Sequence, residues 1–283
     1  MRTVSVVNMK GGVGKSTSVC MLAEALASQA AMRVLVVDLD PQSNASMMLC
    51  GLDKWTELRE HERTLDAYFN QFVHGSEPRR FHEFVAHRVS DLEGEPVVDL
   101  VVATPEFRDV ERDALEKFIR QGFDLQAVRD RLARLTVSAI ESVAQNYDIV
   151  LFDCPPGISL FAEAAIMMSE VVVIPTIPDY VSRLGIYAFR RRAVKAMEKR
   201  RFTEEHILTL ITKYDPNIVL HDSEVQSLQA DFNTFKTIIP QNENIARAGE
   251  WSEVKRTFDQ KYGNAADIVR AVAAEFQERS GLI

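Results

Sequence analysis

A glycine-rich run between a short apolar stretch and a helix-like segment constrains the fold of this chain more than any other feature. The run consists of Lys10, Gly11, Gly12, Val13, Gly14, Lys15, Ser16 and Thr17. It follows the apolar residues 4–7 and opens a segment of helical character that reaches Leu26. Glycines allow successive backbone N–H groups to turn toward one anion, and the positive end of the following helix points at the same place. The run therefore predicts a strand, a phosphate-binding loop and a helix in succession. A glycine-rich turn without a ligand is the alternative.

The side chains of this loop indicate a nucleotide phosphate with Mg²⁺. Lys15 is expected to reach the β- and γ-phosphates, the Ser16 hydroxyl to bind Mg²⁺, and Thr17 to lie near the α-phosphate. Met9 stands where the usual G-x-x-x-x-G-K-[ST] pattern has its first glycine, and Lys10 adds a second lysine to the loop. Turn chemistry alone does not require a lysine and a serine directly after Gly14.

Two further apolar stretches end in carboxylates. Residues 34–37 lead into Asp38 and Asp40, and residues 149–152 lead into Asp153. Ligands of open α/β sheets gather beyond the carboxyl ends of the strands, and a buried carboxylate needs a metal or hydrogen bonds. We therefore expect Asp153 and Asp40 to belong with Ser16 to the Mg²⁺ shell, and Asp40 to orient the attacking water. Capping of a helix N-terminus is the alternative, above all for Asp38.

Short apolar runs alternate with longer amphipathic segments along the whole chain, which predicts an α/β fold with a doubly wound, mostly parallel sheet and helices on both faces, of the P-loop NTPase type. The predicted strands are residues 4–7, 33–37, 97–102, 149–152, 171–174, 207–211 and a short 237–239. We expect one domain over residues 1–283, with a variable, partly helical insertion at about 53–96.

Composition excludes several classes of protein. The net charge of −8 argues against a uniformly basic nucleic-acid coat, so that any DNA binding must come from a local patch. Cys20, Cys50 and Cys154 form no C-x-x-C pair, which argues against zinc, iron–sulfur clusters and a disulfide framework. No apolar run approaches the length of a membrane span and no signal peptide precedes the first strand, so a cytoplasmic location is expected.

Three motifs together resemble the deviant Walker A ATPases of the ParA/MinD group. They are residues 10–17, residues 38–42 (DLDPQ) and residues 147–157 (YDIVLFDCPPG), with weaker similarity at 98–104, 173–175, 184–185 and 239–242. The resemblance implies a weak Mg²⁺-dependent ATPase that binds ATP or ADP and forms a homodimer on ATP. Lys10 would then cross to the partner subunit and act with Lys15 and Asp40 in catalysis. A salt bridge of Lys10 within its own subunit is the alternative.

The same resemblance suggests a second switch and an adenine site. Residues 155–157 would sense the γ-phosphate. The residues expected near the base are Pro240, Gln241, Asn242 and Lys213. Many relatives carry Asn after the strand at 207–211, where this chain has Thr212 and Lys213, so it departs from the family at this base contact.

A basic helix supports the ParA branch, whose members bind DNA non-specifically, are activated by a ParB-like protein and segregate a plasmid or chromosome on the nucleoid. The expected DNA-binding residues are Arg190, Arg191, Arg192, Lys195, Lys199, Arg200, Arg201 and Arg247. On a helical wheel Arg191, Arg192, Lys195 and Lys199 share one face, which suits a phosphate backbone. An ordinary solvated helix face is the alternative. Gln241 and Glu243 lie where relatives that bind DNA often have arginines.

Other outcomes stay open. A ParA-like ATPase can position a protein cargo instead of DNA, and a scaffold can bind nucleotide without turnover. A MinD-like membrane switch needs an amphipathic C-terminal helix, but the tail at 270–283 is alanine-rich and carries two glutamates, so membrane binding is not expected. The lone cysteines do not supply the ligands of an iron–sulfur reductase.

Overall fold

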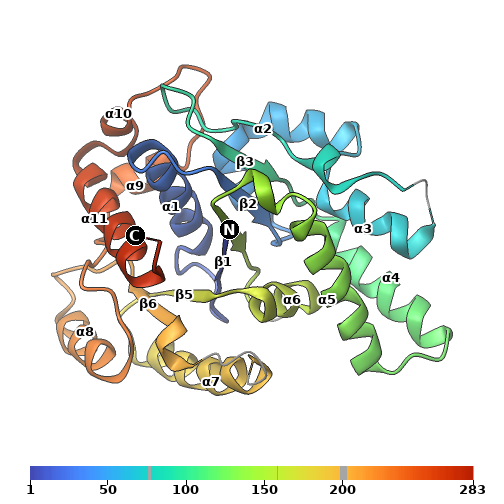
Figure 1. Cartoon of the computed structure of the whole chain (residues 1–283). Coiled ribbons are helices and arrows are strands. Elements are labelled where there is room, and N and C mark those ends of the chain that lie inside the picture. Colours follow the sequence, from blue (N-terminus) through green and yellow to red (C-terminus); the bar gives the residue numbers. More distant parts are fainter. Residues whose placement is uncertain (76–77, 158, 198–202, 283) are drawn as a thin grey trace.

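Six strands form one parallel sheet in the described part of the computed structural model, which comprises residues 1–75, 78–157, 159–197 and 203–282 (Figure 1). The strands are β1 (Arg2–Val6), β2 (Val34–Asp38), β3 (Val98–Val101), β4 (Ile149–Asp153), β5 (Val171–Thr176) and β6 (Ile207–Ile211). Their order is β3-β2-β4-β1-β5-β6, and every pairing of neighbours is parallel. The register pairs Asp38 with Asp153 across β2 and β4. The predicted carboxylates therefore meet at one edge of the sheet.

Helices cover both faces of this sheet, because the strands are apolar on both sides. Along β4, Ile149 and Leu151 pack on one face, whereas Val150 and Phe152 pack on the other. The first face carries α1 (Lys15–Gln29), α2 (Asn44–Glu60), α9 (Glu243–Ala248), α10 (Phe258–Tyr262) and α11 (Ala266–Ser280). The second carries α3 (Leu65–His74), α4 (Phe107–Arg120), α5 (Leu125–Glu141), α6 (Leu160–Met168), α7 (Tyr180–Met197) and α8 (Val219–Asp231). The doubly wound α/β architecture is confirmed. None of the described helices is both long enough and apolar enough to cross a membrane.

Among its described residues, the segment at 53–96 contains the end of α2, helix α3 and a short 3-10 helix at Phe81–Phe84. Helix α2 begins at Asn44 and bends at Gly51, whose φ is +73°, before it ends at Glu60. Helix α3 follows, and Tyr68 on it makes edge-on ring contacts with neighbouring phenylalanines, among them Phe81 and Phe84. The backbone then returns to the sheet, where Ala86 pairs with Leu100. This segment thus packs directly on the sheet.

The predicted strand at 237–239 is wrong. Ile239 donates its backbone N–H to the carbonyl of Ile211 at 2.9 Å, but the segment makes only isolated bridges beside β6. The physical reason is a change of register: Thr209 pairs with Thr234 but Tyr214 pairs with Pro240, so the segment carries one extra residue. The extra residue interrupts the ladder, so the segment does not form a regular strand.

A cluster of buried charges ties three distant segments together. The ammonium of Lys261 in α10 lies 2.6 Å from a carboxylate oxygen of Glu24 in α1 and 2.6 Å from one of Asp91. The hydroxyl of Tyr262 donates to Glu24, and Arg256 pairs with Asp91. Both carboxylates are fully buried, so each depends on these partners. The cluster holds the helix that follows the glycine-rich loop.

Candidate nucleotide-binding site

The glycine-rich loop joins β1 to α1 at the carboxyl edge of the sheet. Gly12 and Gly14 have φ values of +74° and +84°, a region that side chains disfavour. A Cβ atom at either position would meet no heavy atom within 4 Å, so the backbone conformation and not crowding requires glycine. Helix α1 begins at Lys15 directly after the loop. The predicted strand, loop and helix are all present, with the helix N-terminus at the loop.

Lys15 is held inside the site. Its side chain is buried, and its ammonium donates to the backbone carbonyl of Lys10 at 3.2 Å. Burial lowers the pKa of Lys15, although the negative charges of Asp153 and Asp40 oppose that shift. A lysine placed against a backbone oxygen and near two carboxylates is positioned to exchange that oxygen for an anion.

Asp153 is the strongest indication of a bound cation. It ends β4, it is fully buried, and neither of its carboxylate oxygens has a hydrogen-bond partner. Burial raises the pKa of Asp153 well above its usual range, and the charge of Asp38 raises it further; the hydroxyl of Ser16 and the ammonium of Lys15 work in the opposite direction. A buried carboxylate without partners is unfavourable unless a ligand supplies them. Asp153 beside Ser16 therefore fits a divalent cation.

The donor set fits Mg²⁺ better than a metal that needs a full protein cage. Among the described residues, no three His, Cys, Asp or Glu side chains converge on one point. Mg²⁺ is usually held by one or two carboxylates, with substrate phosphates and waters completing the shell. Ser16 and Asp153 would hold such an ion, which would neutralise phosphate charge.

Asp38 and Asp40 have different surroundings. The carboxylate of Asp38 accepts hydrogen bonds from the backbone N–H groups of Asp40 and Ser46 at 2.9 Å each, and from the Ser46 hydroxyl at 2.7 Å. Burial raises the pKa of Asp38 to about 6. Its contact with the first turn of α2 favours the capping alternative. Asp40 uses one oxygen to accept from the N–H of Gln42 at 2.9 Å and lies at the wall of a groove.

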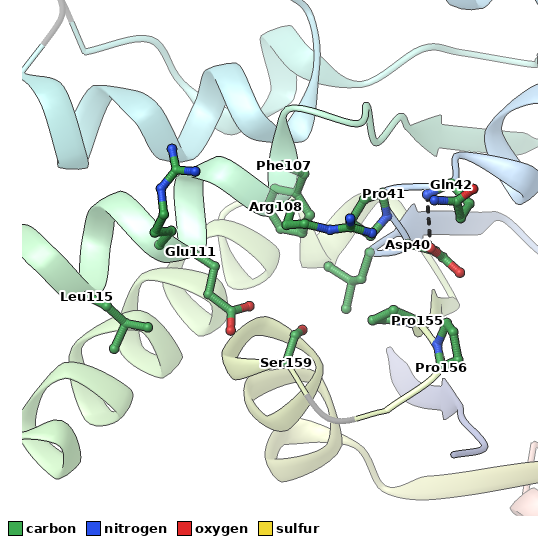
Figure 2. A pocket seen from close by; sticks show the side chains of 12 residues that line it. Asp40, Pro41, Gln42, Phe107, Arg108, Glu111, Leu115, Pro155, Pro156 and Ser159 are labelled. Atoms are coloured by element: carbon green, nitrogen blue, oxygen red, sulfur yellow. Dashed lines mark hydrogen bonds between the residues drawn. The ribbon is translucent and has the colours of Figure 1, made fainter. Parts of the chain in front are cut away.

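This groove, of about 660 Å³, lies between the segment at 40–42, the segment at 155–156 and the first half of α4 (Figure 2). In Figure 2 the side chain of Arg108 extends from α4 toward Pro41, and the carboxylate of Glu111 faces Ser159. Burial raises the pKa of Glu111, while the Leu160 amide and the Ser159 hydroxyl lower it. The groove thus touches Asp40, which is expected to orient the attacking water, and two residues of the expected γ-phosphate sensor, Pro155 and Pro156. Sequence reasoning missed Arg108 and Glu111, since neither belongs to a motif.

A second pocket, of about 180 Å³, lies on the other side of the loop. Its lining includes the predicted Thr17, Lys213, Pro240, Gln241 and Asn242, together with Gly14, Ser18, Met21, Thr212, Ile239, Ile245 and Ala246. Apolar walls with a few polar groups suit a nucleobase. Sequence reasoning missed Met21, although its position one helical turn after Thr17 was a usable signal. The ammonium of Lys213 donates to the carbonyl of Gly12 at 2.7 Å, which ties this pocket to the loop.

Lys10 lies outside the groove and makes contacts within its own chain. Its ammonium is 2.8 Å from a carboxylate oxygen of Asp179 and 3.2 Å from the hydroxyl of Ser182, at the start of α7. Burial opposes ionisation of Asp179, but the hydrogen bonds from Lys10 and Ser182 lower its pKa below the usual range. This contact is a salt bridge within one subunit, the alternative that the sequence left open for Lys10. Its crossing to a partner subunit stays a prediction.

The predicted basic surface is only partly described. Arg190 is engaged within the chain: it pairs with Glu204, donates to the carbonyl of Asp231 at 3.0 Å and lies over the ring of Phe232. Arg191 is exposed, and Arg247 lies 3.9 Å from Glu243. Arg192 and Lys195 belong to α7, but their side chains, like the whole of Lys199, Arg200 and Arg201, lie outside the described residues.

Comparison with known proteins decides the family. A sequence model described as an AAA domain matches residues 1–208. The sporulation initiation inhibitor protein Soj of Bacillus subtilis is 29% identical over 280 residues, which span 96% of this chain and 98% of Soj. The chain belongs to the ParA/MinD family of ATPases.

Other similarities agree with this family. The chromosome partitioning protein ParA of Myxococcus xanthus is 26% identical over 98% of this chain and 88% of its own length. Among solved structures, a plasmid partition protein of Borrelia burgdorferi bound to AMPPNP superimposes with a TM-score of 0.71 at 17% identity, covering 98% of this chain and 99% of that one. At that identity, the likeness shows a shared fold.

Proposed function

We propose that this chain is a Mg²⁺-dependent ATPase that forms a homodimer on ATP and comes apart after hydrolysis. The observation that carries the proposal is the buried, unpartnered carboxylate of Asp153 beside Ser16 and Lys15, at the N-terminus of α1. A nucleoside triphosphate with Mg²⁺ would supply a cation for Asp153 and Ser16 and an anion for Lys15. The AMPPNP bound by the Borrelia relative is consistent with this choice of ligand.

Each residue then has a distinct role. Lys15 binds the β- and γ-phosphates, and the backbone of residues 11–14 surrounds them. Asp40 orients the attacking water, because it lies beyond β2 with one oxygen left free by its bond to Gln42. Pro240, Gln241, Asn242 and Lys213 contact the base. Lys10 leaves Asp179 and reaches the phosphates of the partner subunit, which makes the dimer depend on ATP.

We further propose that the dimer binds DNA non-specifically and moves a DNA cargo, with a ParB-like protein as activator. The name of the M. xanthus relative, a chromosome partitioning protein, supports this branch. The surface would consist of Arg191, Arg192, Lys195, Lys199, Arg200 and Arg201 with Arg247, without the internally paired Arg190. Replacing Arg191, Arg192, Lys195 and Lys199 by Ala should abolish DNA retention and leave dimerisation intact; unchanged retention would point to a protein cargo instead.

Two variants test the ATPase itself. Lys15→Ala should lose nucleotide binding in a fluorescent-nucleotide titration. Asp40→Ala should bind ATP and remain dimeric in sedimentation velocity, while single-turnover hydrolysis falls by at least about 100-fold, as expected when a water-orienting group is lost. If the wild-type chain sediments with one mass in ATP, ADP and no nucleotide, the switch is refuted. If Asp40→Ala hydrolyses ATP normally, Asp40 has another role.

A further inference from the structure

The two residues that follow β6 hold the glycine-rich loop from the C-terminal part of the chain. The hydroxyl of Thr212 donates to the carbonyl of Val13 at 2.8 Å, and the ammonium of Lys213 donates to the carbonyl of Gly12 at 2.7 Å. The partners of these bonds lie 199 and 201 positions apart in the sequence. Two successive carbonyls of the loop therefore depend on two successive side chains at the carboxyl end of β6.

These two carbonyls set the direction of the backbone N–H groups beside them. In a planar trans peptide, the carbonyl oxygen and the N–H of the next residue point in opposite directions. A donor on the carbonyl of Gly12 therefore fixes the N–H of Val13, and a donor on the carbonyl of Val13 fixes the N–H of Gly14. Within the described ranges of the chain, neither N–H donates to another group of the protein. Both are available to an anion such as a phosphate.

Thr212 is a firm support because it is itself fixed to the sheet. Its backbone N–H donates to the carbonyl of Thr176, the last residue of β5, at 2.8 Å. Its buried hydroxyl lies 3.2 Å from that carbonyl and 2.8 Å from the carbonyl of Val13. A hydroxyl has one proton to donate, and the shorter distance assigns it to Val13. The loop is thus attached to the end of a central strand through one buried side chain.

Lys213 supports the loop from an exposed position. Its φ of +53° is uncommon for a residue other than glycine and indicates a constrained backbone. Its ammonium has three N–H groups, of which the carbonyl of Gly12 accepts one. The other two can face the pocket of about 180 Å³ that Lys213 also lines. The contact with the loop is therefore compatible with the contact expected between Lys213 and the base.

We propose that Thr212 and Lys213 are positioning residues of the phosphate site, which hold the loop in its phosphate-binding conformation before the nucleotide arrives. This inference rests on the proposed function, and it adds a role at the loop to the base contact expected of Lys213. Without these donors the two peptide groups of the loop can rotate, and nucleotide binding must then supply the free energy that orders them. The loss of affinity falls on the phosphates of the ligand, whatever base they carry.

The test compares variants that remove the donors with variants that keep them, all in the full-length chain. Lys213→Met and Thr212→Val remove the donors with little change in size, whereas Lys213→Arg and Thr212→Ser keep them. Each chain is titrated, in the presence of Mg²⁺, with ADP and with tripolyphosphate, which has phosphates but no base. Both affinities are measured by competition with a fluorescent ADP, and thermal unfolding checks that each variant is folded.

Two matched controls remove bonds of the same kind outside the nucleotide site. The ammonium of Lys255 donates to the carbonyl of Ser90 at 2.7 Å, so Lys255→Met corresponds to the change at Lys213. The buried hydroxyl of Thr136 donates to the carbonyl of Leu132 at 2.9 Å, so Thr136→Val corresponds to the change at Thr212. Both controls should bind ADP and tripolyphosphate as the wild-type chain does.

We expect Lys213→Met and Thr212→Val each to weaken the binding of tripolyphosphate about five- to tenfold, the scale of one lost hydrogen bond, and to weaken ADP at least as much. Lys213→Arg and Thr212→Ser should keep affinities close to wild type. The inference is overturned if tripolyphosphate binds the Met and Val variants as tightly as the wild-type chain, whether or not ADP binding falls. The proposed function stands in that case, because the wild-type chain still binds both ligands. A wild-type chain that binds neither ligand would refute the proposed function itself.

Discussion

Replacing Asp179 by Asn should tighten the ATP-dependent dimer. In the present structure the ammonium of Lys10 is engaged by Asp179 at 2.8 Å, and it must leave this partner before it can act in another subunit. Asn removes the charge of the pair but keeps an oxygen that can accept from the backbone N–H of Ser182, now 2.8 Å from Asp179. The change therefore weakens the ion pair and leaves the start of α7 capped.

The size of the effect follows from the exposure of the pair. The side chains of Lys10 and Asp179 are 43% and 33% exposed, and such partly solvated pairs contribute roughly 0.5–1 kcal/mol. A dimer must break two of them, so the gain is about 1–2 kcal/mol. At about 1.4 kcal/mol for each tenfold change, the dimer dissociation constant should fall about 5- to 30-fold.

Sedimentation equilibrium with AMPPNP and Mg²⁺ measures this constant directly. Asp179→Ala is the useful comparison, because it also removes the cap and should cost about 1 kcal/mol of fold stability in thermal unfolding. The carboxylate has a lowered pKa, so the pair is complete above about pH 4, the usual range for Asp, and is lost as pH falls through the lowered value. An unchanged or weaker dimer in Asp179→Asn would show that the intrachain contact does not compete with dimerisation.

Two further predictions concern stability. Gly51→Ala should destabilise the fold by about 2–4 kcal/mol in chemical denaturation, because a Cβ there would lie 2.6 Å from the ring of Trp251 and φ is +73°. Gly122→Ala, with φ +89° but no atom within 4 Å, should cost only about 1–2 kcal/mol; equal losses would refute the steric explanation. Lys261→Met should cost about 3–5 kcal/mol, because it leaves two buried carboxylates without their lysine, and a loss below about 1 kcal/mol would contradict this. Burial alone would lower the pKa of Lys261, but Glu24 and Asp91 raise it above its usual value. The stabilisation of the fold by this ion pair is therefore present below about pH 10.4 and is lost as pH rises through the raised pKa.

The sequence predicts the sheet well, because its strands are short, continuous apolar runs, which are typical of strands covered by helices on both faces. The six long runs all became strands, and the carboxylates after β2 and β4 lie at one edge as expected. The failure at 237–239 has a local cause, since the one-residue change of register between Thr234 and Pro240 cannot be read from the residue types. The segment at 53–96 was hard to predict because its order comes from ring contacts around Tyr68 and not from a regular period.

The candidate site also has parts that the sequence predicts and parts that it does not. The loop and its carboxylates follow from motifs, but the resting partner of Lys10 does not, because Asp179 lies 169 positions further along the chain. The same holds for Glu111 and Arg108, which reach the groove only because α4 packs beside the segment at 155–156. Contacts between distant elements depend on helix packing, and no local pattern records them.

The central place of β1 has a consequence for synthesis of the chain. The first strand to leave the ribosome pairs only with β4 and β5, whose residues begin at Ile149 and Val171. Until those segments emerge, β1 has no neighbouring strand to pair with. The pair formed by β2 and β3 must stay folded without β4, which later joins it to β1. Parallel pairing over such separations is slow. A ribosome stalled before residue 149 should therefore display a glycine-rich loop that is open to proteases, and one stalled well after residue 176 should not.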